Sequence, residues 1–371
     1  MLNIKYTCLE IQSIKLANFK NYTRMEVDFH PRLNLILGQN GIGKTNLLDA
    51  LYYLAFGKSY YSITDRKLIR LDAEKPVEDF FRIEGRSSGS DQYSVTYSPS
   101  RGKVVSKNQV PYERISDHIG EIPLVSIFPE DIYVIRHGSA LRRKFVDGTV
   151  GQLEKSYLAS LIRYNHILRQ KNELLRDRRM SLRDKELLLD KYDMDLVPLI
   201  TNIETGRAAF VREFDPLFAT YYQKIAQKES ENATVRYARS FHTAEVAREL
   251  RNCRGQDIEK GRATMGPHRD DFKIMLNGQV ARNFASQGQQ KSILFSLKLA
   301  QYAYIQSALH RWPLLLLDDF FEKLDHRRID HVMSILAGEH PGQIFVTDTD
   351  KDRMIKMATE AGMDYRIIHI E

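Results

Sequence analysis

Gly38-Gln39-Asn40-Gly41-Ile42-Gly43-Lys44-Thr45 is the stretch of sequence that decides the fold. It matches the phosphate-binding pattern G-x-x-x-x-G-K-[ST], in which glycines let successive backbone N–H groups face an anion. Residues 33–37 before it are apolar except for Asn34 and predict a buried strand, and residues 46–55 after it have apolar side chains at helical spacing. A loop that joins a strand to the start of a helix in this way predicts a site for a nucleoside triphosphate.

The same loop indicates which residues hold the ligand. Lys44 is expected to contact the β- and γ-phosphates, and the hydroxyl of Thr45 to bind Mg²⁺. We therefore expect a nucleoside triphosphate and Mg²⁺ as cofactors, and the motif order described below identifies the nucleotide as ATP. The nucleotide-binding residues predicted in this part of the chain are Gly38, Gln39, Asn40, Gly41, Ile42, Gly43, Lys44, Thr45 and Asn46.

Length and composition exclude several classes of protein. The 371 residues can form two or three domains, and no apolar run is long enough to cross a bilayer. The N-terminus lacks the pattern of a secretion signal, and two cysteines are too few for a disulfide framework. These features predict a cytoplasmic protein without a membrane partner. The net charge of +7 is compatible with a polyanionic partner but does not demand one.

The pattern along the chain predicts an α/β fold with a mixed sheet, interrupted by a helical second subdomain. Short strands are expected within residues 9–29 and at 80–85, 92–97 and 103–106. Apolar side chains then step by threes and fours from Tyr157 to Leu175, with one break at Lys171, and again over 196–217. This period favours a helical hairpin, or equally two helices that line a globular core. The α/β pattern resumes after residue 262, with strands predicted at 314–317 and 343–347 and a helix at 327–338.

Arginines gather in the segment between the two helical stretches. A second basic region extends from Arg236 to Arg262. Such clusters either contact nucleic acid or form a solvated face, and both readings remain open. The candidate DNA-binding residues are Arg176, Arg178, Arg179 and Arg183.

Two carboxylates follow the apolar run 314–317, as in a Walker B motif. A carboxylate at the end of a strand beside a phosphate loop can hold Mg²⁺, and the next one can orient or deprotonate the attacking water. We assign Asp318 to the metal, together with Thr45, and Asp319 to the water. A strand can also end in an aspartate simply because a turn follows, so the assignment depends on the phosphate loop.

Ser286-Gln287-Gly288-Gln289-Gln290 begins a predicted helix. Serine and glycine at a helix start are an ordinary cap or a second anion site. The order of phosphate loop, helical insertion, Ser-x-Gly-x-Gln and Walker B is that of an ABC-type ATPase, whose signature segment faces the γ-phosphate held by a second subunit. The sequence therefore predicts an ATP-dependent homodimer with Ser286, Gly288 and Gln289 at the nucleotide. The predicted catalytic residues are Asp319, Lys44 and Ser286.

Residues 322–325 stand where ABC proteins carry the loop that crosses the dimer interface. Another dense cluster is Gly266-Pro267-His268-Arg269-Asp270-Asp271. A turn with internal ion pairs is favoured there over a metal site, because no further ligands occur at suitable spacing.

The chain closely resembles the RecF family of bacterial DNA replication and repair proteins. The resemblance runs almost end to end and rests on residues 16–22, the phosphate loop, Phe128-Pro129-Glu130-Asp131, Arg142-Arg143-Lys144-Phe145-Val146-Asp147, Gly266 to Asp271, the signature segment and residues 316–319. It implies an ABC-type ATPase head, similar to those of chromosome-maintenance proteins but with only a short helical arm and no long coiled coil.

The resemblance also implies function and partners. An ATP-driven homodimer would bind gapped or duplex DNA with weak sequence preference and help RecR and RecO to load RecA. Asp319 is one methylene shorter than the glutamate of most ABC ATPases, which predicts slow hydrolysis. Two departures stand out: Ser59-Tyr60-Tyr61 replaces a serine followed closely by arginine, and Asp49-Ala50 replaces Glu-Ala, a change expected to be silent.

We expect three parts: residues 1–135 as the first half of the head, 136–262 as the helical subdomain, and 263–371 as the second half with signature, Walker B and interface loop. Three other functions remain open. They are a transporter nucleotide-binding subunit, a P-loop kinase for a small molecule, and a structural DNA clamp whose ATPase activity is incidental.

Overall fold

The computed structural model describes residues 7–70, 79–228, 230–319, 326–339 and 342–370. The chain divides into two compact units, each described here by itself. The first unit comprises Met1–Asp131, Lys224–Gln227 and Lys291–Glu371, and the second comprises Ile132–Gln223 and Lys228–Gln290. The signature segment thus ends where the second unit ends.

A parallel sheet forms the centre of the first unit. Four of its five strands are buried along their whole length, which is why they appear as mainly apolar runs in the sequence, whereas the edge strand at 365–369 is partly exposed. The strands predicted at 33–37, 314–317 and 343–347 are confirmed. The order in the sheet is β16 (Tyr365–His369), β4 (Leu33–Leu37), β15 (Ile344–Asp348), β14 (Leu314–Leu317) and β9 (Leu124–Ile127).

The first unit also contains an antiparallel sheet. The strands predicted before residue 107 are confirmed, and they form a sheet separate from the parallel one. The order is β3 (Tyr22–Asp28), β2 (Ile11–Phe19), β5 (Phe81–Ser87), β6 (Gln92–Ser98), β7 (Gly102–Lys107) and β8 (Val110–Pro111).

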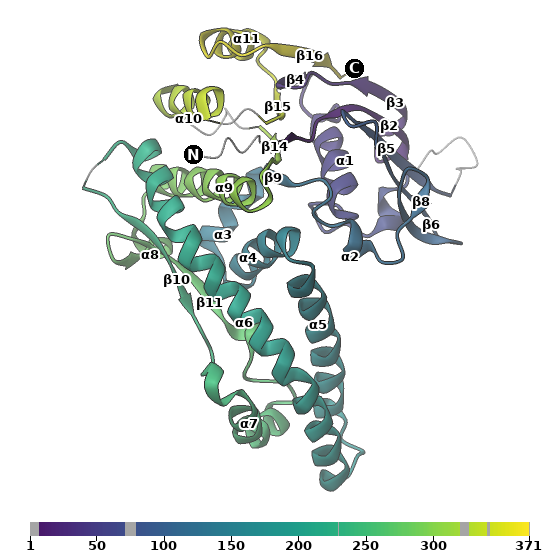
Figure 1. Ribbon diagram of the computed structural model, residues 1–371, viewed down its shortest axis with the longest axis vertical. Helices are drawn as coiled ribbons and strands as arrows, with labels where there is room; N and C mark the ends of the chain where they lie inside the picture. The colour runs from purple at the N-terminus through teal and green to yellow at the C-terminus, as the bar shows by residue number, and fades with distance from the viewer. Residues whose placement is uncertain (1–6, 71–78, 229, 320–325, 340–341, 371) are drawn as a thin grey trace. The chain divides into compact units, whose positions relative to one another are not determined.

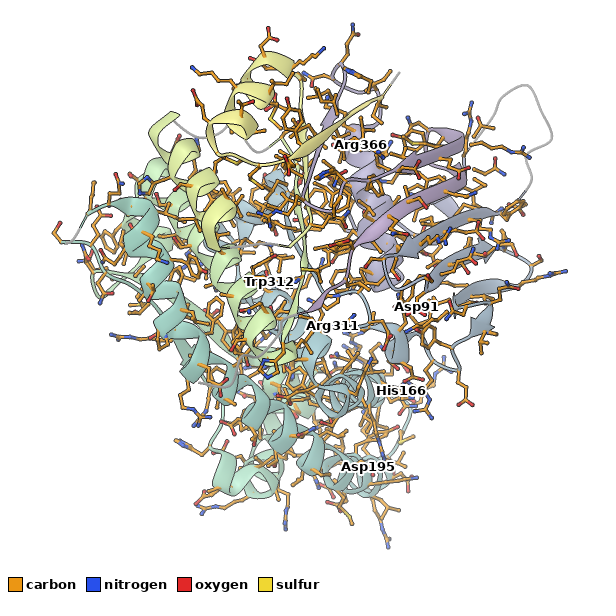
Figure 2. All side chains as sticks on the ribbon, turned by 45° about the horizontal axis from the view of Figure 1, so that its top comes forward. Asp91, His166, Asp195, Arg311, Trp312 and Arg366 are labelled. Carbon is orange, nitrogen blue, oxygen red and sulfur yellow. The ribbon has the colours of Figure 1, made fainter. Side chains whose placement is uncertain are left out.

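Helix α1 (Lys44–Phe56) packs between these two sheets (Figure 1). Leu47 and Leu51 of this helix share one buried core with Ile83 of β5 and Leu316 of β14. The apolar faces of both sheets therefore fix the helix that follows the phosphate loop. The remaining elements of the first unit are β1 (Thr7–Cys8), α2 (Ile115–His118), most of α9 (Gln287–Leu309), β13 (Arg311–Trp312), α10 (His326–Glu339) and α11 (Lys351–Glu360). Arg311 and Trp312, labelled in Figure 2, are separated from β14 by Pro313 alone.

The second unit is mainly helical. The predicted hairpin is confirmed as α5 (Lys155–Arg176) and α6 (Leu182–Ala226), which run side by side (Figure 1) and carry the labelled His166 and Asp195 in Figure 2. Helix α6 continues through two prolines, Pro198 and Pro216. The other elements are α3 (Tyr133–Arg136), α4 (Ser139–Leu153), α7 (Val246–Lys260), α8 (Ala281–Phe284) and an antiparallel sheet of β10 (Ala233–Ala238), β11 (Asp271–Leu276) and β12 (Gln279–Val280).

The break in the apolar pattern at Lys171 has a structural reason. This side chain is buried, and its ammonium group lies 2.9 Å from Asp193 of α6 and 3.4 Å from Asp257 of α7. Arg254 adds a second cation, 2.8 Å from Asp193. A buried charge persists only where opposite charges accompany it, so these groups fix how α5, α6 and α7 fit together.

A second buried network explains the segment Gly266 to Asp271. Arg207 of α6 is 1% exposed and lies 2.9 Å from Asp147 and 3.0 Å from Asp270. Asp270 also accepts hydrogen bonds from the Tyr237 hydroxyl at 2.6 Å and the Ser240 backbone at 2.9 Å.

The sequence predicts ion pairs within the segment Gly266 to Asp271. In the structure its aspartates instead pair with residues of other segments. Asp271 pairs with Arg142 at 2.8 Å, and Arg143 donates to the Asp270 carbonyl at 2.6 Å. The motif at 142–147 and the motif at 266–271 bind each other. Long-range pairing of this kind leaves no signal in local spacing.

Candidate nucleotide-binding site

The phosphate loop connects the end of β4 to the start of α1, as predicted. Gly41 and Gly43 have φ angles of 81° and 126°, a region that favours glycine. No side chain caps the N-terminus of α1. The N–H groups of Lys44 and Thr45 at this end can face an anion, whereas the N–H of Asn46 donates to the Gly43 carbonyl at 2.8 Å. The helix dipole favours negative charge at this end.

The turn between β2 and β3 holds the phosphate loop through two hydrogen bonds to its backbone carbonyls. The Asn21 amide donates to the carbonyl of Ile42 at 2.8 Å, and the Tyr22 hydroxyl donates to the carbonyl of Gly43 at 2.9 Å. A Cβ atom at Gly43 would lie 2.4 Å from the Asn21 amide nitrogen, so only glycine fits. Residues 16–22 belong to the resemblance, but their contact with the loop was not predicted from the sequence.

Lys44 lies at the centre of the loop. Its ammonium group donates to the carbonyls of Gly38 and Gln39 at 2.8 and 2.9 Å, and the side chain is buried. These contacts hold the positive charge over the curled backbone, where the motif places the phosphates.

The loop meets the Walker B strand at Thr45 and Asp318. The Thr45 hydroxyl lies 2.9 and 3.0 Å from the two carboxylate oxygens of Asp318. Burial, the largest cause, raises the pKa of the Asp318 carboxyl to about 6, with the neighbouring Asp319 charge adding to it and hydrogen bonds from Thr347 and Thr45 opposing it. A buried carboxylate beside a hydroxyl is a hard oxygen donor set that favours a divalent cation, so these residues fit Mg²⁺.

The described residues contain no group of three or more His, Cys, Asp or Glu side chains placed to hold a metal ion. Thr45 and Asp318 would thus share the ion with phosphate oxygens and water, which is how Mg²⁺ is commonly held at such sites. Asp319 follows directly, with its backbone in the left-handed region at φ 44°. Its N–H donates to the Thr347 hydroxyl at 2.9 Å.

The two departures from the family pattern meet beside this site. Asp49 is fully buried and accepts hydrogen bonds from the Ser59 hydroxyl at 2.7 Å and the Tyr60 N–H at 2.8 Å. Lys20 forms an ion pair with Asp49 at 2.7 Å and lies 5.3 Å from the centre of the Tyr61 ring. Asp49 therefore anchors the loop at 59–61. That aspartate replaces glutamate here without effect stays a prediction.

Tyr61 stands where the family pattern suggested a basic residue. Burial raises the pKa of its phenol far above the ordinary value, and the nearby carboxylates of Asp318 and Glu130 raise it further. A hydroxyl rather than a cation therefore faces the Walker B carboxylate.

The signature segment lies in the second unit, at the start of α9. The Gln289 N–H donates to the Ser286 hydroxyl at 3.2 Å, and the Ser286 N–H donates to the Gln289 side chain at 2.8 Å. This reciprocal pair is a capping box. The Gln289 amide also reaches Glu231 at 2.9 Å. Ser286 is exposed and Gly288 is half-buried, so both can be reached from solvent.

The four candidate DNA-binding arginines lie around the connection from α5 to α6. All four are exposed, and none forms an ion pair with another of the residues that the structure describes. The second basic region behaves differently, since Arg239 pairs with Glu204 at 2.7 Å and Arg254 with Asp190 at 2.8 Å.

The ends of the two basic regions meet. A Cβ atom at Gly261 would lie 3.5 Å from Cγ of Arg176, which brings the exposed Lys260 and Arg262 beside the first cluster. Sequence spacing gave no sign of this convergence. Residues 322–325, expected to form the interface loop, lie outside the described residues.

Comparison with known proteins assigns the family. A family model described as the RecF/RecN/SMC N terminal domain matches residues 10–367. The chain is 34% identical over 363 residues to the DNA replication and repair protein RecF of Porphyromonas gingivalis, covering 97% of this chain and 98% of that protein. RecF of Bacteroides fragilis is 36% identical over 365 residues, covering 97% and 96%. The chain belongs to the RecF family.

Solved structures agree with this assignment. A structure of the recombination mediator protein RecF with ATP, in the RecFOR pathway, has a TM-score of 0.84 at 27% identity and covers 93% of each chain. A structure of the Smc head bound to the C-winged helix domain of ScpA has a TM-score of 0.57 at 14% identity, and the match covers 97% of this chain and 93% of that one. The predicted ABC-type ATPase head is confirmed. No described helix has both the length and the apolar character that a membrane span requires.

Proposed function

We propose that the chain is an ATP-dependent DNA-binding protein of recombinational repair and replication-fork maintenance, acting in the cytoplasm and in the SOS response. The observation that carries the proposal is the contact of Thr45 with Asp318, which joins the phosphate loop to Walker B. Membership of the RecF family supports the role in DNA replication and repair. In this proposal residues 1–135 and 263–371 form the two halves of the head around the helical subdomain 136–262.

Each residue of the site has a role that its chemistry supports. Backbone N–H groups of the loop and of α1 bind the phosphates, and Lys44 carries the balancing charge. Thr45 and Asp318 would hold Mg²⁺, which supplies charge neutralisation on the phosphate oxygens. Asp319 accepts a hydrogen bond from the attacking water and orients it. Asn46 and the remaining loop residues complete the nucleotide contacts.

Hydrolysis in this proposal is weak and DNA-dependent. The shorter side chain of Asp319 orients water less well than glutamate would, so ATP serves as a switch whose slow cleavage releases the DNA.

The site becomes complete only with a second copy of the chain. Ser286, with Gly288 and Gln289, offers a hydroxyl and helix N-terminal N–H groups to the nucleotide of the partner. ATP binding then closes the homodimer over gapped or duplex DNA. Exposed arginines around residues 176–183 would contact DNA phosphates, which predicts weak sequence preference and strong salt dependence. RecR is the proposed direct partner, with RecO and RecA acting through it.

Light scattering of the purified chain tests the switch. ATP with Mg²⁺ should double the mass of the wild-type chain but not of Lys44→Met, because the variant lacks the charge that balances the triphosphate. An ATP-independent mass in both proteins would refute the proposal. Binding to duplex, gapped and single-stranded DNA, with and without ATP, separates it from a transporter subunit or a small-molecule kinase, neither of which should bind DNA in response to ATP.

Asp319→Asn tested for repair in cells separates the switch from a clamp. The switch requires hydrolysis, so the variant should fail to restore repair. Full repair by a hydrolysis-deficient Asp319→Asn protein would favour the clamp.

A further inference from the structure

One hydroxyl group joins the two carboxylate residues of Walker B. Thr347 lies on β15, beside β14, and is fully buried. Its Oγ1 donates to Oδ1 of Asp318 at 2.8 Å and accepts from the backbone N–H of Asp319 at 2.9 Å. A hydroxyl carries one proton, and a main-chain N–H can only donate, so these two contacts fix the direction of both hydrogen bonds.

The Thr347 hydroxyl also holds the backbone of Asp319. The φ of Asp319 is 44°, in the left-handed region, which residues other than glycine adopt less often, with asparagine and aspartate as the commonest exceptions. The Thr347 hydroxyl is the partner that the structure shows for its N–H. The rotamer of Asp318 is fixed from the other side by the hydroxyl of Thr45, at 2.9 Å.

We propose that Thr347 is a positioning residue of the ATP site. Its hydroxyl fixes the metal-binding carboxylate of Asp318 and the main chain of Asp319 relative to each other. The inference rests on the proposed function, in which Asp318 binds Mg²⁺ and Asp319 orients water. In this proposal Thr347 contacts neither the nucleotide nor the water. It restricts the movement of the Asp318 carboxylate and of the Asp319 main chain.

Substitutions separate this role from simple packing. Thr347→Val keeps the branched shape that suits a buried strand but removes the hydroxyl, whereas Thr347→Ser keeps the hydroxyl and loses the methyl group. Thr347→Ala removes both and serves where the valine variant does not fold. Ser296→Ala is the matched control, because its buried hydroxyl in the same unit donates to the carbonyl of Ser292 at 2.7 Å, within α9.

The test is binding of a fluorescent, non-hydrolysable ATP analogue to the full chain during a Mg²⁺ titration. Thr347→Val should raise the Mg²⁺ concentration at half-maximal binding about tenfold, the effect of one lost hydrogen bond to a charged group. It should leave binding in excess chelator unchanged and lower the rate of ATP hydrolysis. Thr347→Ser and Ser296→Ala should stay within about twofold of the wild type, since both keep the Thr347 hydroxyl or its equivalent.

Two results would overturn the role of Thr347 but leave the proposed function standing. They are an unchanged Mg²⁺ titration for Thr347→Val, and a serine variant as impaired as the valine variant. A wild-type chain that binds the analogue equally well at every Mg²⁺ concentration would overturn the metal role of Asp318 in the proposed function, and the inference with it.

Discussion

Thr45 and Asp318 lie 2.9 Å apart although 273 positions separate them in the chain. Parallel strands β4 and β14 flank β15, so the groups that follow their carboxyl ends meet at one edge of the sheet. This edge is where open α/β sheets bind ligands. The contact therefore joins the phosphate loop to the Walker B carboxylate, whose sequence signal is weak alone, and makes them one site.

Asp49 should prove important for the stability of the first unit. Asp49→Asn leaves the Lys20 ammonium without its counter-charge. Breaking a buried ion pair costs about 3–5 kcal/mol. We expect a loss near the lower value, because the Lys20 side chain is partly exposed to solvent. The measurement is urea unfolding followed by circular dichroism. Asp28→Asn, at the exposed end of β3, is the control and should change the free energy of unfolding by less than about 0.5 kcal/mol. Equal effects of the two substitutions would contradict the anchoring role.

Arg207 should be the most sensitive position of α6. Arg207→Met leaves Asp147 and Asp270 buried without their cation, which we expect to cost about 3–5 kcal/mol. Arg212→Met changes a residue on the same helix whose side chain is 75% exposed and whose guanidinium group lies 3.6 Å from Glu213. This control should have almost no effect on the unfolding midpoint. A stable Arg207→Met protein would show that the network is dispensable.

His268 should make stability depend on pH. Burial lowers the pKa of this side chain to about 4 from an ordinary value of 6.5. Between these values the unfolded chain binds more protons, so the stability is complete above pH 6.5 and is lost as the pH falls toward 4. The full effect is about 3 kcal/mol. The difference in unfolding free energy between wild type and His268→Gln isolates this effect. Parallel pH curves for the two proteins would contradict it.

The exposed arginines at the α5–α6 connection should contribute to DNA binding through phosphates. Arg178→Ala combined with Arg179→Ala should weaken binding similarly for all sequences and reduce the slope of log affinity against log salt by about 2. Fluorescence anisotropy across a salt series measures this slope. Arg248→Ala is the control, since this exposed residue pairs with Glu245 at 3.4 Å. An unchanged slope in the double variant would place the DNA elsewhere.

The sequence pattern predicted those parts of the fold that depend on residues close together in the chain. The strand, loop and helix around Lys44, the strand before Asp318 and the helical hairpin all follow from spacing and turn chemistry. Pro198 and Pro216 would suggest helix ends, yet tertiary packing carries α6 through both. Thr347, Asn21 and the anchoring role of Asp49 were missed, because each acts through a partner far away in the sequence. The partners of Asp270 were missed for the same reason.

The central claim is that two copies of the chain complete one ATP site, and mixing two inactive variants tests it most directly. Lys44→Met destroys the phosphate loop, and Ser286→Arg destroys the signature. Each variant alone should hydrolyse no ATP in the presence of DNA. An equal mixture should recover a clear fraction of the wild-type rate, because each mixed dimer contains one intact site, formed by the phosphate loop of the Ser286→Arg chain and the signature of the Lys44→Met chain. A mixture no more active than its components, or a fully active Ser286→Arg protein, would contradict the claim.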